Sequence, residues 1–251
     1  MLGYVSRVLE RLWGVKLTRI SAESATRLAD VSPEIRDTVE RARQYTMTSL
    51  ERLVALCMAV EHVVANEVKG AFVECGVWRG GSSMAAAWTY RRLGREDVDV
   101  FLFDTFEGMP APGEEDVLHS TGEKAAELLA TSDRKSGIWA YSPEEDVRRN
   151  LVSTGYPAER LHFVKGLVEE TIPARAPEQI SVLRLDTDWY ESTKHELVHL
   201  FPRLSRNGIL IVDDYGHWAG ARKAVDEYFL AHNLKPFLGR VDYTGRLLVK
   251  S

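Results

Sequence analysis

The sequence contains little cysteine and no long apolar run. Its two cysteines, Cys57 and Cys75, lie in apolar segments and form no CxxC pair, which excludes a disulfide framework and a cysteine-based metal motif. We therefore predict two reduced thiols in the core. No stretch of 18 or more apolar residues is present, so a membrane span is not expected. Charged residues interrupt the N-terminal segment MLGYVSRVLERLWGVKL, unlike the apolar centre of a signal peptide, and a cytoplasmic protein is expected.

The sequence also has no excess of basic residues. The 251 residues include 32 Lys and Arg against 37 Asp and Glu, for a net charge of −5, and no run of five like charges occurs. A polyanion-binding surface usually requires a basic excess, so no nucleic-acid partner is expected. A hydrophobic fraction of 45% is too high for a disordered chain, and no internal repeat is visible. These features predict one folded domain over residues 1–251.

The first part of this domain, residues 1–69, is predicted to be a helical N-terminal extension. Asp30 or Ser32, followed by Pro33, is a typical helix start. Apolar residues then recur at helical spacing over residues 50–64. The amphipathic N-terminal segment suits a docking or dimer helix better than a membrane-surface helix. We therefore expect a homo-oligomer, most simply a dimer.

The core, predicted over residues 70–251, alternates strand-like and helix-like segments. Five apolar runs are rich in Val, Ile, Leu and Phe: AFVECGV, VFLFDTF, LHFVKG, SVLRLDTD and GILIVDD. Runs that are apolar on both faces suit parallel strands that helices cover on both sides. The helical candidates between them are Ser82–Arg92, Pro143–Val152 behind a Ser142 cap, Glu191–Leu204 and Ala219–Ala231. This alternation predicts an α/β fold with a doubly wound, mostly parallel sheet.

Two further segments complete this α/β prediction. The tail PFLGRVDYTGRLLVK has turn residues between alternating apolar residues, which predicts a C-terminal antiparallel hairpin at one edge of the sheet. Residues 107–141 instead contain prolines, glycines and mixed charge, with one short helix expected at Glu123–Ala130. Loops of this length are usually lids, binding loops or disordered segments. We predict a substrate lid, with a floppy insertion as the alternative.

A glycine-rich turn follows the first predicted strand. In FVECGVWRGGSS the strand ends at Glu74 and a helix begins at Ser82. The glycines between them are Gly76, Gly80 and Gly81. Glycine lets the backbone approach a ligand closely, and a helix N-terminus offers unpaired N–H groups. The spacing is not GxGxxG, which disfavours a dehydrogenase. Asp104 ends the next strand, where a carboxylate can bind two ribose hydroxyls, so a nucleoside-containing ligand is predicted.

Four carboxylates end two other predicted strands. Asp186 and Asp188 close LRLDTD, and Asp213 and Asp214 close LIVDDY. The ends of parallel strands emerge at one edge of the sheet, where these acids would repel one another strongly without a cation. Oxygen ligands suit Mg²⁺, Ca²⁺ or Mn²⁺, so a metal or catalytic site is predicted. The alternative is that these acids cap helices or pair with nearby cations, namely Arg184, Lys194 or Arg222.

Histidine and tryptophan residues near these strand ends are further candidates. His195 and His199 have the spacing of a zinc pair but lack the glutamate of HExxH, which disfavours zinc. His217 follows the Asp213–Asp214 pair closely and is a candidate substrate contact. Three tryptophans also fall in loop or strand-end positions near the predicted site: Trp139, Trp189 and Trp218.

Four segments together have the pattern of a known family. VECGVWRGGSS, LFDTFEGMP, VLRLDTDWYEST and LIVDDYGHWAGARKAVDEY occur in this order. They resemble the S-adenosylmethionine-dependent O-methyltransferases of the macrocin and mycinamicin type, which include the noviose methyltransferase of aminocoumarin synthesis. The resemblance runs from about Tyr45 to Phe229. It implies a Rossmann-like class I methyltransferase fold and methylation of a sugar hydroxyl in a glycosylated natural product or polysaccharide.

The resemblance also implies roles for individual residues. Those implied to surround the cofactor S-adenosylmethionine are Met47, Thr48, Glu74, Gly76, Gly80, Gly81 and Ser82, with Asp104 on its ribose. The implied Mg²⁺ ligands are Asp186, Asp213 and Asp214, and Asp188 matches the proposed general base. Mycinamicin-type enzymes place a candidate catalytic histidine in the lid, but this chain has none around Asp133–Lys135, and His119 lies well upstream.

The resemblance leaves the acceptor open. Mg²⁺ bound to a sugar hydroxyl would lower its pKa, and Asp188 could then take the proton. Mg²⁺ could activate a hydroxyl of a catechol or another diol in the same way, so that acceptor class stays an alternative. A non-catalytic module that binds a nucleoside is a third hypothesis, and the concentration of carboxylates speaks against it.

Overall fold

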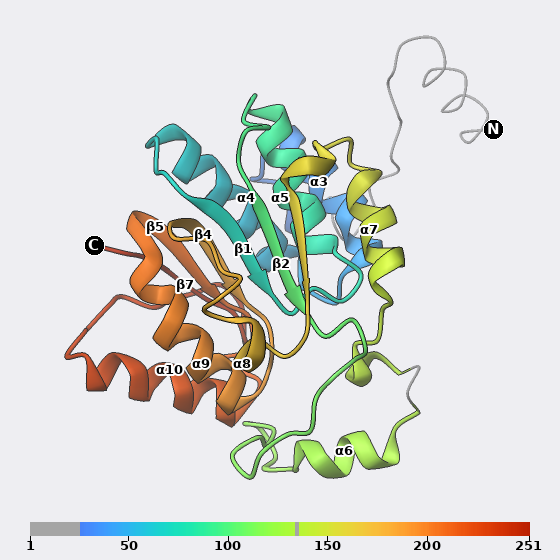
Figure 1. The fold of residues 1–251 in the computed structure, drawn as a ribbon, viewed down its shortest axis with the longest axis vertical. Coiled ribbons are helices and arrows are strands. Elements are labelled where there is room, and N and C mark those ends of the chain that lie inside the picture. Colours follow the sequence, from blue (N-terminus) through green and yellow to red (C-terminus); the bar gives the residue numbers. More distant parts are fainter. Residues whose placement is uncertain (1–25, 134–135) are drawn as a thin grey trace.

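The computed structural model describes residues 26–133 and 136–251 (Figure 1). Its centre is a seven-stranded sheet in the order β3-β2-β1-β4-β5-β7-β6. The strands are β1 (Ala71–Cys75), β2 (Val100–Asp104), β3 (Leu161–Lys165), β4 (Ile180–Leu185), β5 (Leu204–Val212), β6 (Gly239–Arg240) and β7 (Arg246–Val249). Strands β1 to β5 pair in parallel, and β7 and β6 continue the sheet antiparallel. This arrangement confirms the predicted α/β fold and its C-terminal hairpin.

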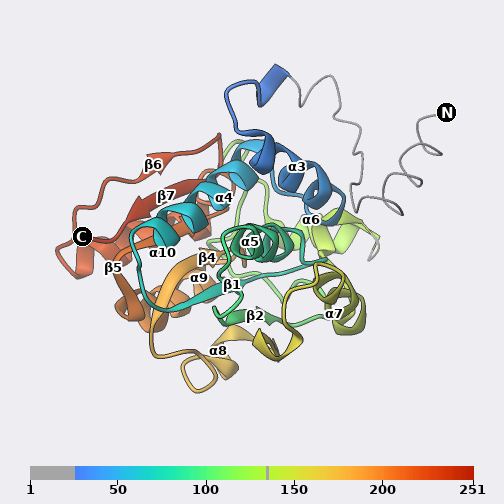
Figure 2. The ribbon, with the colours of Figure 1, turned by 90° about the horizontal axis from the view of Figure 1, so that it is seen from above.

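Helices cover both faces of the sheet (Figure 2). One layer consists of α3 (Pro33–Ala42), α4 (Leu50–Ala65), α5 (Gly81–Arg92) and α7 (Glu144–Val152). The other consists of α8 (Val168–Thr171), α9 (Tyr190–Leu200) and α10 (Ala219–Ala231). Side chains alternate along β1, because Phe72 belongs to the core under the first layer whereas Val73 belongs to the second. The two-sided burial explains why the strands read as continuous apolar runs.

The N-terminal part that is described forms two helices. Ser32 caps α3 by accepting a hydrogen bond from Ile35 N (3.3 Å), with Pro33 in the first turn, which confirms that predicted start. A short turn, η1 (Arg43–Tyr45), and an extended loop then lead to α4. Ser49 caps α4 through Arg52 N (3.2 Å). The amphipathic segment at the chain start lies outside the described residues.

Two predicted helix ends were wrong. Helix α7 begins at Glu144 behind Pro143, and no side chain caps it, so the predicted Ser142 cap does not form. Helix α9 ends at Leu200, because Pro202 lies in the tight turn η4 (Phe201–Arg203) and its ring cannot continue the helical hydrogen bonds. Strand β5 consequently begins earlier than its apolar run suggested.

The segment 107–141 projects beyond the carboxyl ends of the strands (Figure 1). It contains the helix α6 (Ala125–Thr131) and the turn η2 (Gly137–Trp139), so the expected short helix is present. The remaining short turn, η3 (Ala158–Arg160), precedes β3. A bridge between Leu118 and Trp218 ties the segment to the start of α10. The segment therefore lies against the part of the sheet where the predicted site residues end their strands.

Two expectations from composition also have a structural counterpart. Cys57 and Cys75 are both buried, free thiols, as predicted. Over residues 26–133 and 136–251, no helix combines the length and the apolar character needed to cross a bilayer.

Candidate active site

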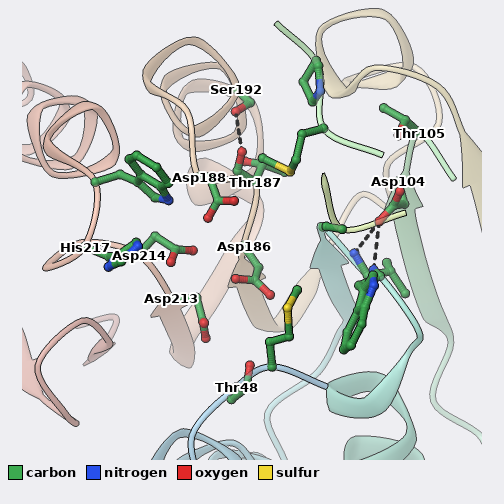
Figure 3. Close-up of a pocket in the computed structure, with 18 of the residues that line it drawn as sticks. Thr48, Asp104, Thr105, Asp186, Thr187, Asp188, Ser192, Asp213, Asp214 and His217 are labelled. Carbon is green, nitrogen blue, oxygen red and sulfur yellow. Dashed lines mark hydrogen bonds between the residues drawn. The ribbon is translucent and has the colours of Figure 1, made fainter. Parts of the chain in front are cut away.

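A cavity of about 480 Å³ opens at the carboxyl ends of the parallel strands. Its walls come from the loop before α4, the turn after β1, the ends of β2 and β4, the loop after β3 and the predicted lid. Figure 3 shows Asp186, Asp188, Asp213 and Asp214 on one side of this space and Asp104 across it. The structure therefore brings both groups of predicted site residues to one cavity, where doubly wound sheets bind their ligands.

Asp104 ends β2 and holds the glycine-rich turn in place. Its Oδ2 accepts hydrogen bonds from Val77 N (2.6 Å) and Trp78 N (3.0 Å), and its Oδ1 accepts one from Phe106 N (2.7 Å). Burial raises the pKa of Asp104, and these three N–H groups oppose that rise. Three donors leave part of the carboxylate's accepting capacity free. Asp104 can therefore fix the turn and accept hydrogen bonds from a ligand as well.

The three glycines of this turn serve different contacts. Gly76 has φ +81°, and a Cβ there would overlap the carbonyl oxygen of Asp186, so glycine permits the close approach of the β1 and β4 ends. A Cβ at Gly80 would press on Leu151 of α7, and one at Gly81 would press on the loop before α4. Of these three glycines, Gly76 alone lines the cavity.

The predicted cofactor residues thus form two sets. Those that line the cavity are Met47, Thr48, Gly76, Ser82 and Asp104. Those that lie behind its wall are Glu74, Gly80 and Gly81. A supporting role fits the second set, and direct cofactor contact by its members stays a prediction.

Arg184 of β4 lies fully buried beneath the cavity and joins three carboxylates. Its Nη1 contacts Glu74 Oε1 (2.6 Å) and Asp186 Oδ2 (2.7 Å), and its Nη2 contacts Asp213 Oδ1 (2.6 Å). Nη2 also donates to Thr48 Oγ1 (2.8 Å). Two of the four strand-end acids, Asp186 and Asp213, therefore pair with Arg184, as the alternative interpretation expected. Burial raises the pKa values of Glu74 and Asp186, and the charge of Arg184 opposes this rise while its hydrogen bonds fix the carboxylates in position.

A second cation, Arg52 of α4, reaches the same acids from the N-terminal helices. Its Nη1 hydrogen-bonds Asp213 Oδ2, and its Nε contacts Asp242 Oδ2 (3.0 Å). Asp242 also accepts a hydrogen bond from the Ser49 hydroxyl (2.6 Å). Both carboxylate oxygens of Asp213 are therefore occupied by guanidinium groups.

The remaining three aspartates form a group that suits a cation. One carboxylate oxygen each from Asp186, Asp188 and Asp214 lies within 4.8 Å of the others. Oδ2 of Asp214 is buried and has no hydrogen-bond partner in the described part of the chain. Burial raises the pKa of all three, to about 7 for Asp188. An orphaned buried oxygen among three acids is the donor set that a hard divalent cation such as Mg²⁺ prefers.

The structure thus fits a metal at Asp186 and Asp214 and places Asp188 beside them. Asp213, the third predicted ligand, faces two arginines instead. The assignment of Asp213 to the metal and of Asp188 to the proton stays a prediction. Asp188 has a left-handed backbone with φ +67°, a conformation that is uncommon outside glycine but that aspartate adopts more readily than most residues.

Comparison with known proteins agrees with this geometry. A family model described as macrocin-O-methyltransferase (TylF) matches residues 14–250. The chain belongs to this family. It is therefore an S-adenosylmethionine-dependent O-methyltransferase, which confirms the resemblance and decides against the dehydrogenase and the non-catalytic module.

Several relatives of this O-methyltransferase have named activities. The demethyldecarbamoylnovobiocin O-methyltransferase of Streptomyces niveus is 35% identical over 204 residues, which cover 81% of this chain and 75% of the relative. A tetracenomycin rhamnosyl 4′-O-methyltransferase of Streptomyces olivaceus is 36% identical over 201 residues, with 80% and 74% covered. The solved structure of the O-methyltransferase NovP matches with a TM-score of 0.72 at 33% identity, covering 82% of each chain.

Aromatic residues of the methyltransferase flank the carboxylates. His217 and Trp218 line the cavity, and Tyr243 Oη lies 3.3 Å from His217 Nδ1. Burial lowers the pKa of His217, and the charge of Arg52 lowers it further. Trp189 packs edge-on against Trp218, with ring centroids 5.0 Å apart. These side chains form an apolar and partly polar wall beside the aspartates, suited to an organic acceptor.

The other predicted aromatic and histidine candidates lie elsewhere. Trp139 does not line the cavity, and its Nε1 donates to Ser132 O (3.2 Å). The rings of His195 and His199 contact each other along α9 in a tilted arrangement, and His195 Nε2 contacts Ile172 O (2.9 Å). Neither belongs to the candidate metal group of the described residues.

Sequence reasoning missed a buried acid, Glu196 of α9. It is fully buried, and the Thr187 hydroxyl donates to both of its oxygens (3.0 and 3.2 Å). No salt bridge to Glu196 occurs among residues 26–133 and 136–251, and burial raises its pKa well above the ordinary value. Because Thr187 separates Asp186 from Asp188, this contact holds the loop that carries both aspartates. A helical periodicity places Glu196 on the buried face of α9, which is the one signal available in advance.

We predict that Glu196→Gln has a higher free energy of unfolding than the wild type, and that this difference grows as pH rises. The folded chain keeps a proton on Glu196 that the unfolded chain has released, so wild-type stability falls above the unfolded pKa by up to about 1.4 kcal/mol per pH unit. Glutamine mimics the neutral acid and escapes this loss. Urea unfolding at mildly acidic and mildly alkaline pH measures the difference, with exposed Glu191→Gln on the same helix as control. A constant difference at both pH values would contradict a neutral Glu196.

Proposed function

We propose that this methyltransferase is Mg²⁺-dependent and methylates a sugar hydroxyl in a glycosylated natural product or polysaccharide. The observation that carries the metal is the orphaned Oδ2 of Asp214 within the Asp186, Asp188 and Asp214 group. The observation that supports the acceptor is the set of relatives, whose names specify novobiocin, tetracenomycin and mycinamicin substrates. The predicted dimer and cytoplasmic location stay predictions.

S-adenosylmethionine would occupy the side of the cavity formed by β1 and β2. Asp104 would accept hydrogen bonds from the ribose hydroxyls while it holds the turn. Gly76 and Ser82 would lie along the methionine part, where the start of α5 offers free N–H groups. Met47 and Thr48 would close the cavity from the loop before α4.

The acceptor would lie between the aspartates and the aromatic wall. Mg²⁺ at Asp186 and Asp214, with Asp213 beside them, would lower the pKa of a bound sugar hydroxyl. Asp188 would take the hydroxyl proton, and the Arg184 ion pairs would hold Asp186 and Asp213 in place. The lid segment would exclude water from the reacting groups.

Calorimetric titration with S-adenosylhomocysteine, with and without Mg²⁺, tests this proposal, followed by mass spectrometry of an acceptor panel. We expect cofactor binding, Mg²⁺ binding that Asp214→Asn abolishes, and methylation of glycosides. Methylation of catechols alone would move the acceptor to the diol alternative. Methylation that proceeds unchanged in EDTA would remove the metal from the proposal.

Asp104→Asn is expected to weaken S-adenosylhomocysteine binding by about 10- to 100-fold. An amide nitrogen cannot accept a hydrogen bond, so it would leave at least one of the three turn N–H groups unpaired, at a cost of about 1–3 kcal/mol. The same calorimetric titration measures the dissociation constant. Glu107→Gln is the matched control, because Glu107 is exposed nearby and pairs only with Lys165 at the surface among the described salt bridges. Equal affinities in the wild type and Asp104→Asn would exclude Asp104 from the cofactor site.

A further inference from the structure

Asp116 is a buried acid in the lid segment and does not belong to the Asp186, Asp188 and Asp214 group. Its side chain is 2% exposed, and no basic side chain pairs with it within the described ranges. Oδ1 accepts a hydrogen bond from Tyr190 N (2.8 Å), and Oδ2 accepts one from Gly113 N (2.7 Å). Its carbonyl oxygen accepts a third from Ala125 N, at the start of α6 (2.9 Å). One residue of the lid therefore satisfies donors from three places in the fold.

The contact with Tyr190 supplies a cap that α9 lacks. Tyr190 is the first residue of α9, and the N-cap residue Trp189 makes no capping hydrogen bond through its own side chain. An acceptor with negative charge at a helix N-terminus satisfies an orphan N–H and interacts favourably with the helix dipole. Asp116 therefore supplies a capping acceptor to the first N–H of α9 from a segment 74 positions away in the sequence.

The start of α10 is shaped to receive the same carboxylate. A Cβ at Gly220 would overlap Asp116 Oδ1, so the absence of a side chain at Gly220 creates the space that Asp116 fills. Around this point Ala219 N donates to Val117 O (2.9 Å), and His119 N donates to His217 O (2.8 Å). Lid, α9 and α10 thus meet at one buried carboxylate.

All three segments carry residues of the cavity. Asp188 lies two residues before Tyr190, His217 and Trp218 lie just before α10, and the lid contributes Leu118. We propose that Asp116 is a positioning residue, which caps α9 from the lid and thereby fixes Asp188 and the acceptor-side wall relative to each other. The cofactor side, on β1 and β2, does not depend on this contact. The inference deepens the proposed function and rests on it only for the metal readout described below.

Four variants test the proposal: Asp116→Ala, Asp116→Asn, Gly220→Ala and the double variant Asp116→Ala with Gly220→Ala. Hydrogen exchange in peptides covering the first turn of α9 is the primary readout. We expect Asp116→Ala to speed exchange there by about 2- to 30-fold, the effect of losing an N-cap. Asp116→Asn keeps an oxygen for Tyr190 N and should protect α9, with faster exchange only at the Gly113 turn. Wild-type exchange rates in Asp116→Ala would overturn the proposal.

The Gly220→Ala variants show whether the contact between Asp116 and the start of α10 is responsible for the protection of α9 from hydrogen exchange. The added Cβ should displace Asp116 and reproduce the Asp116→Ala exchange pattern, while the double variant should be no worse than either single variant. Additive effects in the double variant would overturn the shared contact. Glu115→Gln is the matched control, because it removes a neighbouring lid charge whose only described partner is the surface residue Lys223.

Mn²⁺ and S-adenosylhomocysteine titrations separate positioning from general loss of structure. The loop that leads into α9 carries the proposed ligand Asp186 as well as Asp188. Because this loop would move with the frayed start of α9, we expect Mn²⁺ affinity to fall about 10-fold in Asp116→Ala, with S-adenosylhomocysteine affinity within about 2-fold of wild type. Equal losses of both would show a merely structural role. If the wild type bound no Mn²⁺, the proposed metal would fail, whereas the exchange experiment would still decide the role of Asp116.

Discussion

Asp188→Asn is expected to lower methyl-transfer turnover by about 1,000-fold while cofactor binding stays unchanged. Asparagine matches the shape of aspartate but cannot take a proton from the acceptor, and general-base catalysis is typically worth 10²- to 10⁴-fold. Burial beside Asp186 and Asp214 raises the pKa of Asp188 to about 7 without a cation, and Mg²⁺ held by these neighbours would lower it, which favours the ionised form that a base requires. Single-turnover rates with saturating S-adenosylmethionine measure the loss without interference from product release.

Metal binding in the same variant separates the two roles that the geometry allows for Asp188. If it is the base, Asp188→Asn keeps Mn²⁺ affinity, and Asp213→Asn and Asp214→Asn lose it. If Mn²⁺ binding instead disappears in Asp188→Asn and persists in Asp213→Asn, Asp188 is the third metal ligand and Asp213 serves only to hold Arg184 and Arg52. Asp146→Asn, an exposed residue of α7, is the control for a charge change far from the cavity. Full turnover in Asp188→Asn would remove it from the mechanism altogether.

The fold followed from local patterns in the sequence because its strongest signals are local. Apolar runs such as SVLRL form parallel strands, since both faces of the sheet are covered by helices. Helix ends were less predictable, because they depend on single residues in competition. Ser142 is a good capping residue by type, yet Pro143 takes the N-cap position of α7. The end of α9 likewise depends on Pro202 rather than on the apolar pattern that continues past it.

The candidate site likewise contains some features that local sequence patterns predict and others that they do not. The strand-end acids and the glycine turn could be predicted, because topology alone brings the ends of parallel strands together. Their partners could not. Arg52 and Asp213 are 161 positions apart, and Arg52 and Asp242 are 190 apart, so no local pattern connects them. The cap of α9 by Asp116 was hidden for the same reason, since a lid residue substitutes for an N-cap that the sequence before α9 lacks.

Arg184→Met is expected to lower the free energy of unfolding by about 3–5 kcal/mol at neutral pH. Arg184 is fully buried and forms ion pairs with Glu74, Asp186 and Asp213. Methionine has a similar length, but it would leave these carboxylates buried beside one another without their shared cation, which is the costly way to break a buried ion pair. Chemical unfolding followed by circular dichroism measures the change. Arg92→Met is the matched control, because its salt bridge with Glu61 is at the surface and surface pairs contribute about 0–1 kcal/mol.

The pH dependence of this loss distinguishes unpaired charge from a simple packing defect. Burial already raises the pKa values of Glu74 and Asp186 in the wild type, against the charge of Arg184. Without Arg184 these pKa values would rise further, so the folded variant would bind more protons than the folded wild type. Its stability would then rise as pH falls toward the unfolded pKa values, and the gap to wild type would narrow at mildly acidic pH. A packing defect would leave the gap constant over the same range. A constant gap would mean that Arg184 fills space beneath the cavity, and the carboxylates would then need another source of positive charge to stay ionised in the apo protein.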